Sequence, residues 1–213
     1  MLKFAITVAV SLLLLLGGCS SAPPSEGQKS GDAGKTAAPA KQEAKKEAER
    51  ITGREAFQKL YLAARNWSPD SRPLKMESRA RSDEPRDGKA SAWAATFASQ
   101  QRGLFRSFLW SGAEGESSIT PGSQDTYSAG NASTQPFDPA YLKADTDEAL
   151  TAADKHAPAA AKKDKQGPIA FQLYNDTAKQ RILWRVIYGA SEHNAKAVVD
   201  ISARDGGFVK VEK

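Results

Sequence analysis

The sequence predicts an α+β protein made of two tandem units, each a helix followed by an antiparallel sheet. Three observations support this prediction. A capped amphipathic helix is expected to begin at Thr52 and another at Asp145, 93 residues later. A strand with the pattern Trp-x-x-x-aromatic occurs at residues 93–97 and again at 184–188, at an offset of 91. In both copies, a turn of five residues leads to another strand, which ends near an acidic residue and a glycine.

The two helices are predicted from their caps and from the spacing of their apolar residues. Thr52-Gly53-Arg54-Glu55 has the spacing of a capping box, in which side chains at the first and fourth positions satisfy free backbone amides. Asp145-Thr146-Asp147-Glu148 has the same spacing. Apolar residues follow at helical intervals, namely Phe57, Leu60, Tyr61 and Ala64 in the first helix and Ala149, Leu150, Ala153 and Ala157 in the second.

Apolar residues alternating with other residues predict the strands. The expected strands are residues 73–77, 92–97, 104–110 and 117–120 in the first unit and 168–174, 183–188, 195–203 and 208–212 in the second. A segment rich in Ser, Gly, Asn and Pro separates the two sets and has the composition of a loop. We therefore expect a first unit at 51–122, a connecting loop at 123–144 and a second unit at 145–213.

The first nineteen residues have the layout of a secretory signal peptide. Lys3 is the only charge before Cys19, and the apolar run from Phe4 to Leu16 is shorter than the roughly 20 residues that cross a bilayer. The run ends in Leu16-Gly17-Gly18-Cys19, which resembles the lipobox of bacterial lipoproteins. The resemblance implies that residues 1–18 are removed and that Cys19 carries a diacylglycerol thioether, so that lipid holds the chain at a membrane.

The residue after Cys19 bears on which membrane this is. Asp at that position would resemble the inner-membrane retention signal of enteric bacteria, but the chain has Ser20. In a Gram-negative host, we therefore expect an outer-membrane location facing the periplasm.

Residues 19–50 are predicted to form a disordered tether that begins at the lipidated cysteine. From Ser20 to Arg50 there is no aromatic residue and no Leu, Ile or Val, so this segment cannot bury enough apolar surface to offset the entropy of ordering it. A flexible coil of this length has an end-to-end distance of roughly 30 Å.

Composition excludes several classes of function. Cys19 is the only cysteine, so its lipidation would leave no thiol for disulfides, cysteine catalysis or thiolate metal sites. The part after the tether has a formal charge of about +3, and its basic residues are too dispersed to form a nucleic-acid-binding stripe. We expect no cofactor and no nucleic-acid partner.

The second unit resembles a PepSY domain. The resemblance is carried by Glu148-Ala149-Leu150 at the helix start, by Leu183-Trp184-Arg185-Val186, and above all by residues 198–209, where a strand ends near an Asp, a turn carries Gly and an apolar strand returns. It covers about 65 residues. It implies a cystatin-like helix-on-sheet fold without catalytic residues, for which protease inhibition or protein binding is proposed. The first unit departs from the pattern, with Leu109 at the position of Asp200.

The aromatic residues of the paired strands allow two interpretations. Trp93, Phe97, Trp184 and Tyr188 can form a platform on which sugars stack, or they can belong to the core. The core is favoured, because their alternation is what a sheet covered by a helix requires.

Asp200 and Asp205 also allow two interpretations. They flank a turn and can in principle share a cation, but no third carboxylate accompanies them in the sequence. A strand-end acid and a turn acid are therefore favoured over a metal site.

No catalytic motif is evident. The two histidines, His156 and His193, have neither metal-ligand nor triad spacing, and the serines at 123, 128 and 133 lack a Gly-x-Ser-x-Gly elbow. We therefore expect a non-catalytic module that binds an envelope protein or protease through a sheet face or edge, with protease inhibition as one role that such binding could have. The alternative is an envelope glycan-binding protein or hydrolase that uses the cleft between the two units.

Overall fold

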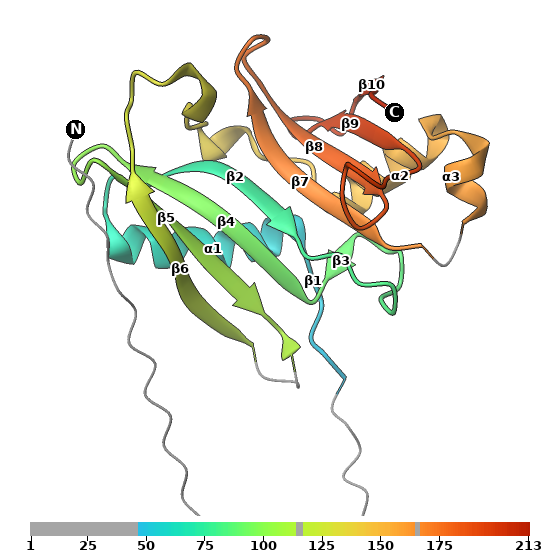
Figure 1. Ribbon diagram of the computed structural model, residues 1–213, viewed down its shortest axis with the longest axis horizontal. Helices are drawn as coiled ribbons and strands as arrows, with labels where there is room; N and C mark the ends of the chain where they lie inside the picture. Colours follow the sequence, from blue (N-terminus) through green and yellow to red (C-terminus); the bar gives the residue numbers. More distant parts are fainter. Residues whose placement is uncertain (1–46, 114–116, 165–166) are drawn as a thin grey trace, which may run out of the picture. The chain divides into compact units, whose positions relative to one another are not determined.

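The structure is a computed structural model that describes residues 47–113, 117–164 and 167–213. This part of the chain is an α+β fold, in which two main helices pack on one face of an eight-stranded antiparallel sheet (Figure 1). The predicted fold class, α+β with antiparallel strands, is confirmed. The predicted signal peptide at 1–18, Cys19 and the tether up to residue 46 lie outside the described residues. No helix in the described part is long and apolar enough to cross a bilayer.

In both halves of the chain, one main helix is followed by four strands of the large sheet. The first half contains β1 (Ile51–Thr52), α1 (Gly53–Trp67), β2 (Arg72–Ser78), β3 (Lys89–Ala90), β4 (Ala92–Ser99), β5 (Leu104–Ser111) and β6 (Ser118–Thr126). The connection contains two short 3-10 helices, η2 (Ala132–Thr134) and η3 (Pro139–Tyr141). The second half contains α2 (Thr146–His156), α3 (Ala159–Lys163), β7 (Ile169–Asp176), β8 (Arg181–Tyr188), β9 (Val198–Ser202) and β10 (Phe208–Val211).

One sheet is formed by both halves, with the strand order β10-β9-β8-β7-β2-β4-β5-β6. The halves join where β2 pairs with β7, and from this junction the strands of each half run outward in chain order. The pair Glu77 and Gln172 lies at the junction. The inner strand of each half therefore pairs with the inner strand of the other, and the two halves form a single sheet.

The amino termini of the two helices meet above this junction. The carboxylate of Asp145 caps α2 in a capping box with Glu148, as predicted, and it also accepts the backbone amide of Arg54 in α1 at 2.9 Å. The hydroxyl of Thr146 accepts the amide of Gly53 at 2.8 Å. The positive ends of two helix dipoles thus share one carboxylate.

The core fills the layer between the helices and the sheet. Trp93 and Trp184 are fully buried at its centre, with ring centroids 6.5 Å apart in an edge-on arrangement. Phe57 of α1 packs on Phe97 of β4, whose ring meets Phe108 of β5 edge-on. This core buries one face of the sheet, so a binding surface on the sheet has to lie on the opposite face.

Two boundaries of the first half differ from the prediction. The tether was predicted to extend to residue 50, but the amide of Glu49 donates to the carbonyl of Gly112 at 2.8 Å and Arg50 pairs with Asp87 at 2.5 Å. These contacts fix the chain before Ile51. The last strand was predicted to end at Thr120, with a loop at 123–144, but β6 runs to Thr126. Pairing with β5 extends this polar strand, although its own sequence has no apolar alternation.

Two differences occur in the second half. The segment predicted as a strand at 195–203 pairs as β9 only over Val198–Ser202. Residues 159–163, which follow Pro158, form the short helix α3, which was not predicted from the sequence. In the first half, the two-stranded ribbon of β1 and β3 was not predicted either, because strands of two residues carry no periodic signal.

Candidate functional site

The face of the sheet opposite the helices carries a trough over β2, β4, β5 and β6. Two adjoining hollows form it, of about 480 and 260 Å³, and they share Lys75, Thr96, Ser107 and Ser123. The larger hollow is also lined by Leu74, Phe105, Thr134, Gln135, Tyr174 and Asn175, and the smaller by Glu77, Arg79, Ala94, Phe108, Leu109 and Gly122. The larger hollow lies in the lower part of the range of about 300–1,000 Å³ that is usual for ligand sites.

Small hydroxyl side chains form the floor of the trough. Thr96 of β4 and Ser107 of β5 lie opposite each other, with their hydroxyl oxygens 3.3 Å apart. The Ser107 hydroxyl lies 3.4 Å from that of Ser123 on β6. Because these bonds are long and each hydroxyl can make others, the floor keeps hydrogen-bonding capacity for a ligand.

The same region of the second half is filled. At the offset of 91 residues, Thr96 corresponds to Ile187 and Ser107 to Val198, and both counterparts are buried. They pack with Ala170 and Ala195 in a small apolar cluster of their own. The fold itself therefore does not require an open face here, and the trough results from the small side chains of the first half.

In the second half, a charged network lies at neighbouring positions of β8 and β9. Arg185 on β8 bonds both oxygens of the fully buried Asp200 on β9, with its Nε 2.9 Å from Oδ1 and one Nη 3.1 Å from Oδ2. The Tyr174 hydroxyl donates to Asp200 at 2.8 Å. Arg185 also pairs with Glu192 at 3.0 Å and Glu212 at 3.3 Å.

This network raises the pKa of two of its members. The hydrogen bond to Asp200 raises the pKa of Arg185 above its ordinary value. Burial, followed by the hydrogen bond to Asp200, raises the pKa of the Tyr174 phenol above its ordinary value. Both groups therefore keep their protons at neutral pH, and the single phenol proton of Tyr174 is donated to Asp200.

The β2 wall of the trough is different, because its charges are not paired. Lys75 and Glu77 lie at alternate positions of β2, and Arg79 follows directly after the strand ends at Ser78; all three line the trough. None of the three forms an ion pair or side-chain hydrogen bond with another residue of the described chain. The charges of this wall are therefore not neutralised by ion pairs with other described residues.

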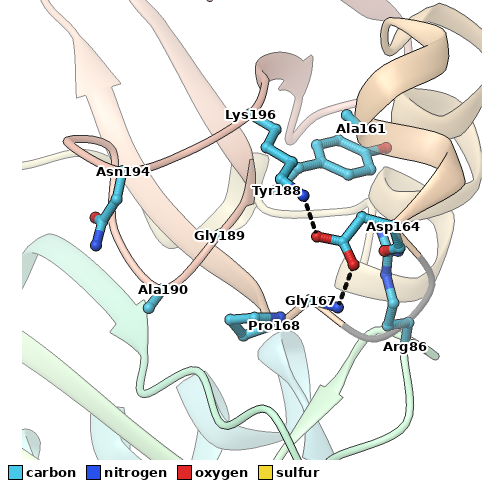
Figure 2. Close-up of a pocket in the computed structure, with 10 residues that line it drawn as sticks. All are labelled: Arg86, Ala161, Asp164, Gly167, Pro168, Tyr188, Gly189, Ala190, Asn194 and Lys196. Atoms are coloured by element: carbon cyan, nitrogen blue, oxygen red, sulfur yellow. Dashed lines mark hydrogen bonds and ion pairs between the residues drawn. The ribbon is translucent and has the colours of Figure 1, made fainter.

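A separate hollow, of about 250 Å³, lies beside Tyr188 and is shown in Figure 2. Lys196 reaches the carboxylate of Asp164 at 2.5 Å, and Arg86 donates to the Asp164 carbonyl while its guanidinium lies 5.4 Å from the centre of the Tyr188 ring. Burial raises the pKa of Tyr188, with a further contribution from its hydrogen bond to Asp154. The polar groups around this hollow bind one another, so it is a weaker candidate than the trough.

The aromatic residues considered for sugar stacking belong to the core. Trp93 and Trp184 have no exposed surface, and their indole nitrogens donate to the backbone carbonyls of Ile51 and Ala144. Tyr188 is 4% exposed and donates to Asp154 at 2.6 Å. None of the three offers a free ring face to a sugar, so the platform interpretation is wrong for these residues.

Asp200 and Asp205 are used separately. Asp200 is held by Arg185, while Asp205 accepts the amide of Gly207 at 3.0 Å within the turn before β10. Hydrogen bonds from Ser202 and Gly207 lower the pKa of Asp205. In residues 47–113, 117–164 and 167–213, no group of three or more His, Cys, Asp or Glu side chains is placed to hold a metal ion.

The residues that line the trough were not predicted from the sequence as a site. The strand at residues 92–97 was predicted from its buried positions, and Ala94 and Thr96, on the other face, were given no role. A signal was present, because Arg185 and Ile187 stand at the corresponding positions of the second half. This loss of bulk between the two halves is what marks an unfilled surface.

Comparisons with known proteins found no match. No protein-family model, no curated protein and no solved structure matches this chain.

Proposed function

We propose that this chain is a lipid-anchored, non-catalytic binding module of the cell envelope, which holds a segment of an envelope protein or protease in the trough. The lipobox-like sequence ending at Cys19 supports the anchor and favours the outer membrane of a Gram-negative host. The matching element order of the two halves and the outward strand order from β2 and β7 support tandem PepSY-like units.

One observation carries the proposal, namely that the trough is open in one half and filled in the other. Side chains at Ala94, Thr96 and Ser107 are small, whereas Arg185 and Ile187 occupy the corresponding positions of the second half. Packing a sheet face with larger apolar side chains stabilises a fold. A face that lacks them, and that is lined by unpaired charges and hydroxyls, is suited to a ligand.

The first experiment tests the trough. A photo-reactive amino acid placed at Ser123 of the full-length protein in envelopes should cross-link the same partner in repeated preparations. Adding Ser107→Trp should fill the trough and reduce the yield at least tenfold. Gln58→Trp, the matched control on the exposed side of α1, should leave the yield unchanged. A partner that does not recur, or that cross-links equally with Ser107→Trp, contradicts the proposal.

The anchor is tested separately. Cys19→Ala should move the protein from the membrane fraction to the soluble fraction and abolish its labelling by a radioactive fatty acid. Unchanged labelling of this variant would show that the lipid is attached elsewhere or is absent from Cys19.

A second candidate function, glycan binding, is favoured by the lining of the larger hollow. Phe105 and Tyr174 are only partly buried there, and hydroxyl and amide groups such as those of Ser123 and Asn175 lie between them. Rings with an exposed face and side-chain hydrogen-bonding groups are what a sugar requires. Calorimetric titration with soluble peptidoglycan fragments tests this function, and heat that disappears in Phe105→Ala would support it.

A further inference from the structure

We propose that the ligand in the trough is an extended polypeptide segment with acidic, basic and acidic side chains at alternate positions. This inference rests on the proposed function and specifies the chemistry of the partner. It is carried by the spacing of two charges on β2, Lys75 and Glu77, and of Arg79, which follows the last residue of this strand.

The β2 wall presents the pattern basic, acidic, basic. Lys75, Glu77 and Arg79 line the trough, and no ion pair joins any of them to another described residue. By contrast, Arg185 and Lys196, on or next to the strands of the second half, are both in ion pairs. The charges of this wall are therefore available to a ligand.

The spacing of these charges matches an extended chain. Residues two apart on a strand lie about 7 Å apart on the same face, and a ligand strand lying along β2 has the same period. From Leu74 to Arg79 the wall has the length of about five extended residues, or roughly 17 Å. Such a segment can place an acidic side chain near Lys75, a basic one near Glu77 and an acidic one near Arg79.

The floor provides contacts for the backbone of the segment. The backbone groups of β4 and β5 are paired within the sheet, so the open face offers a ligand only side chains. Thr96, Ser107 and Ser123 supply hydroxyls along the trough, which can donate to or accept from a peptide backbone. Side-chain charges then provide the selection among sequences.

The test uses two synthetic peptides and a charge-reversed variant. The probes are Thr-Glu-Thr-Lys-Thr-Glu-Thr and Thr-Lys-Thr-Glu-Thr-Lys-Thr, both blocked at their ends and fluorescently labelled, and binding to full-length protein in detergent is measured by polarisation at low salt. Exposed ion pairs are weak singly. Three matched against three mismatched pairs should favour the first peptide by about tenfold.

Reversal of the wall should reverse the preference. Lys75→Glu/Glu77→Lys/Arg79→Glu should bind the second peptide better, whereas Arg72→Glu, a change on the same strand outside the trough, should keep the original preference. If the triple variant does not fold, as judged by circular dichroism, Lys75→Glu alone should reduce the preference at least twofold.

Each other outcome counts against the inference. A preference that is absent, or that does not change in the charge-reversed variants, overturns it, and so does failure of both peptides to bind. If the partner cross-link at Ser123 is still lost in Ser107→Trp, the proposed function survives such a result and only the charge pattern fails. Binding of peptidoglycan fragments without peptide binding would overturn both and favour the glycan function.

Discussion

Replacing Asp200 alone is expected to destabilise the protein more than replacing Asp200 and Arg185 together. Asp200 is fully buried on β9 and receives bonds from Arg185 and Tyr174. In the first half, the corresponding pair of positions holds Leu109 and Ala94, which lie opposite each other across β5 and β4. The molecule therefore carries an ionic and an apolar version of the same pair of positions.

The magnitude follows from what each variant leaves behind. Asp200→Leu removes the buried partner of Arg185, whose side chain is 16% exposed. Arg185 keeps two carboxylate partners, Glu192 and Glu212, which are 45% and 38% exposed, and its hydrogen bond to the Tyr174 hydroxyl. Breaking one side of a buried ion pair costs about 3–5 kcal/mol, and the two remaining carboxylates favour the lower value, about 3 kcal/mol. Arg185→Ala/Asp200→Leu removes both charges, and such apolar replacements are often neutral, so we expect a cost within about 1 kcal/mol.

Urea unfolding of the soluble chain starting at Ser20 measures this difference, followed by circular dichroism. With a slope of about 2 kcal/mol per molar urea, Asp200→Leu should lower the midpoint by about 1.5 M and the double variant by less than about 0.5 M. Arg185→Ala completes the double-mutant cycle. If the double variant is as unstable as the sum of the two single variants, the ionic pair does not act as a unit and the reasoning is refuted.

Two further predictions concern the first half. Gly53→Ala should destabilise the protein by about 1–3 kcal/mol although alanine favours helices, because its methyl group would lie 2.6 Å from atoms of Thr146 and Trp184. Thermal unfolding measures this loss, and the control Gln58→Ala, on the exposed side of α1, should show none. A Gly53→Ala variant as stable as the unsubstituted protein would contradict the close approach. Burial of Asp70 acts to raise its pKa, but hydrogen bonds from the Gln101 amide and from the Ser99 and Ser68 hydroxyls outweigh burial and lower the pKa to about 2. The stabilisation by this carboxylate is therefore complete above about pH 4 and is lost as the pH falls towards 2. Asp70→Asn should lower the free energy of unfolding by about 1 kcal/mol at pH 7, after allowance for solvent screening, and by progressively less at lower pH. Urea titrations at several pH values measure this loss. A loss that does not change with pH would exclude the ionised carboxylate as its source.

Local signals in the sequence were sufficient to predict the two main helices, most of the strands and the fold class. The helix beginning after Asp145 was found because a capping box needs only residues within one turn of each other. The strands carrying Trp93 and Trp184 were found because burial of one sheet face imposes alternation along the chain. The repeated order of these signals also allowed the element order of the second half to be compared with that of the first.

The strand β6 could not be predicted in full from the sequence, because its extent depends on its neighbour. All nine of its residues are exposed, and it includes Pro121 and Gly122, which individually disfavour strands. Its hydrogen bonds to β5 determine where it ends. Its polar surface and its Pro121 are features that protect a sheet edge from pairing with another chain.

By itself, the sequence determined the class of the fold, the order of the two main helices and of the strands of the large sheet, and the lipobox-like segment ending at Cys19, because each of these depends on residues close together in the chain. Only the tertiary structure decided that β2 and β7 join the halves into one sheet and that the helix amino termini share Asp145. It also decided that Lys75, Thr96 and Ser107 line one trough. These three residues come from three strands, and their proximity depends on sheet register and on which face the helices cover, neither of which a local pattern contains.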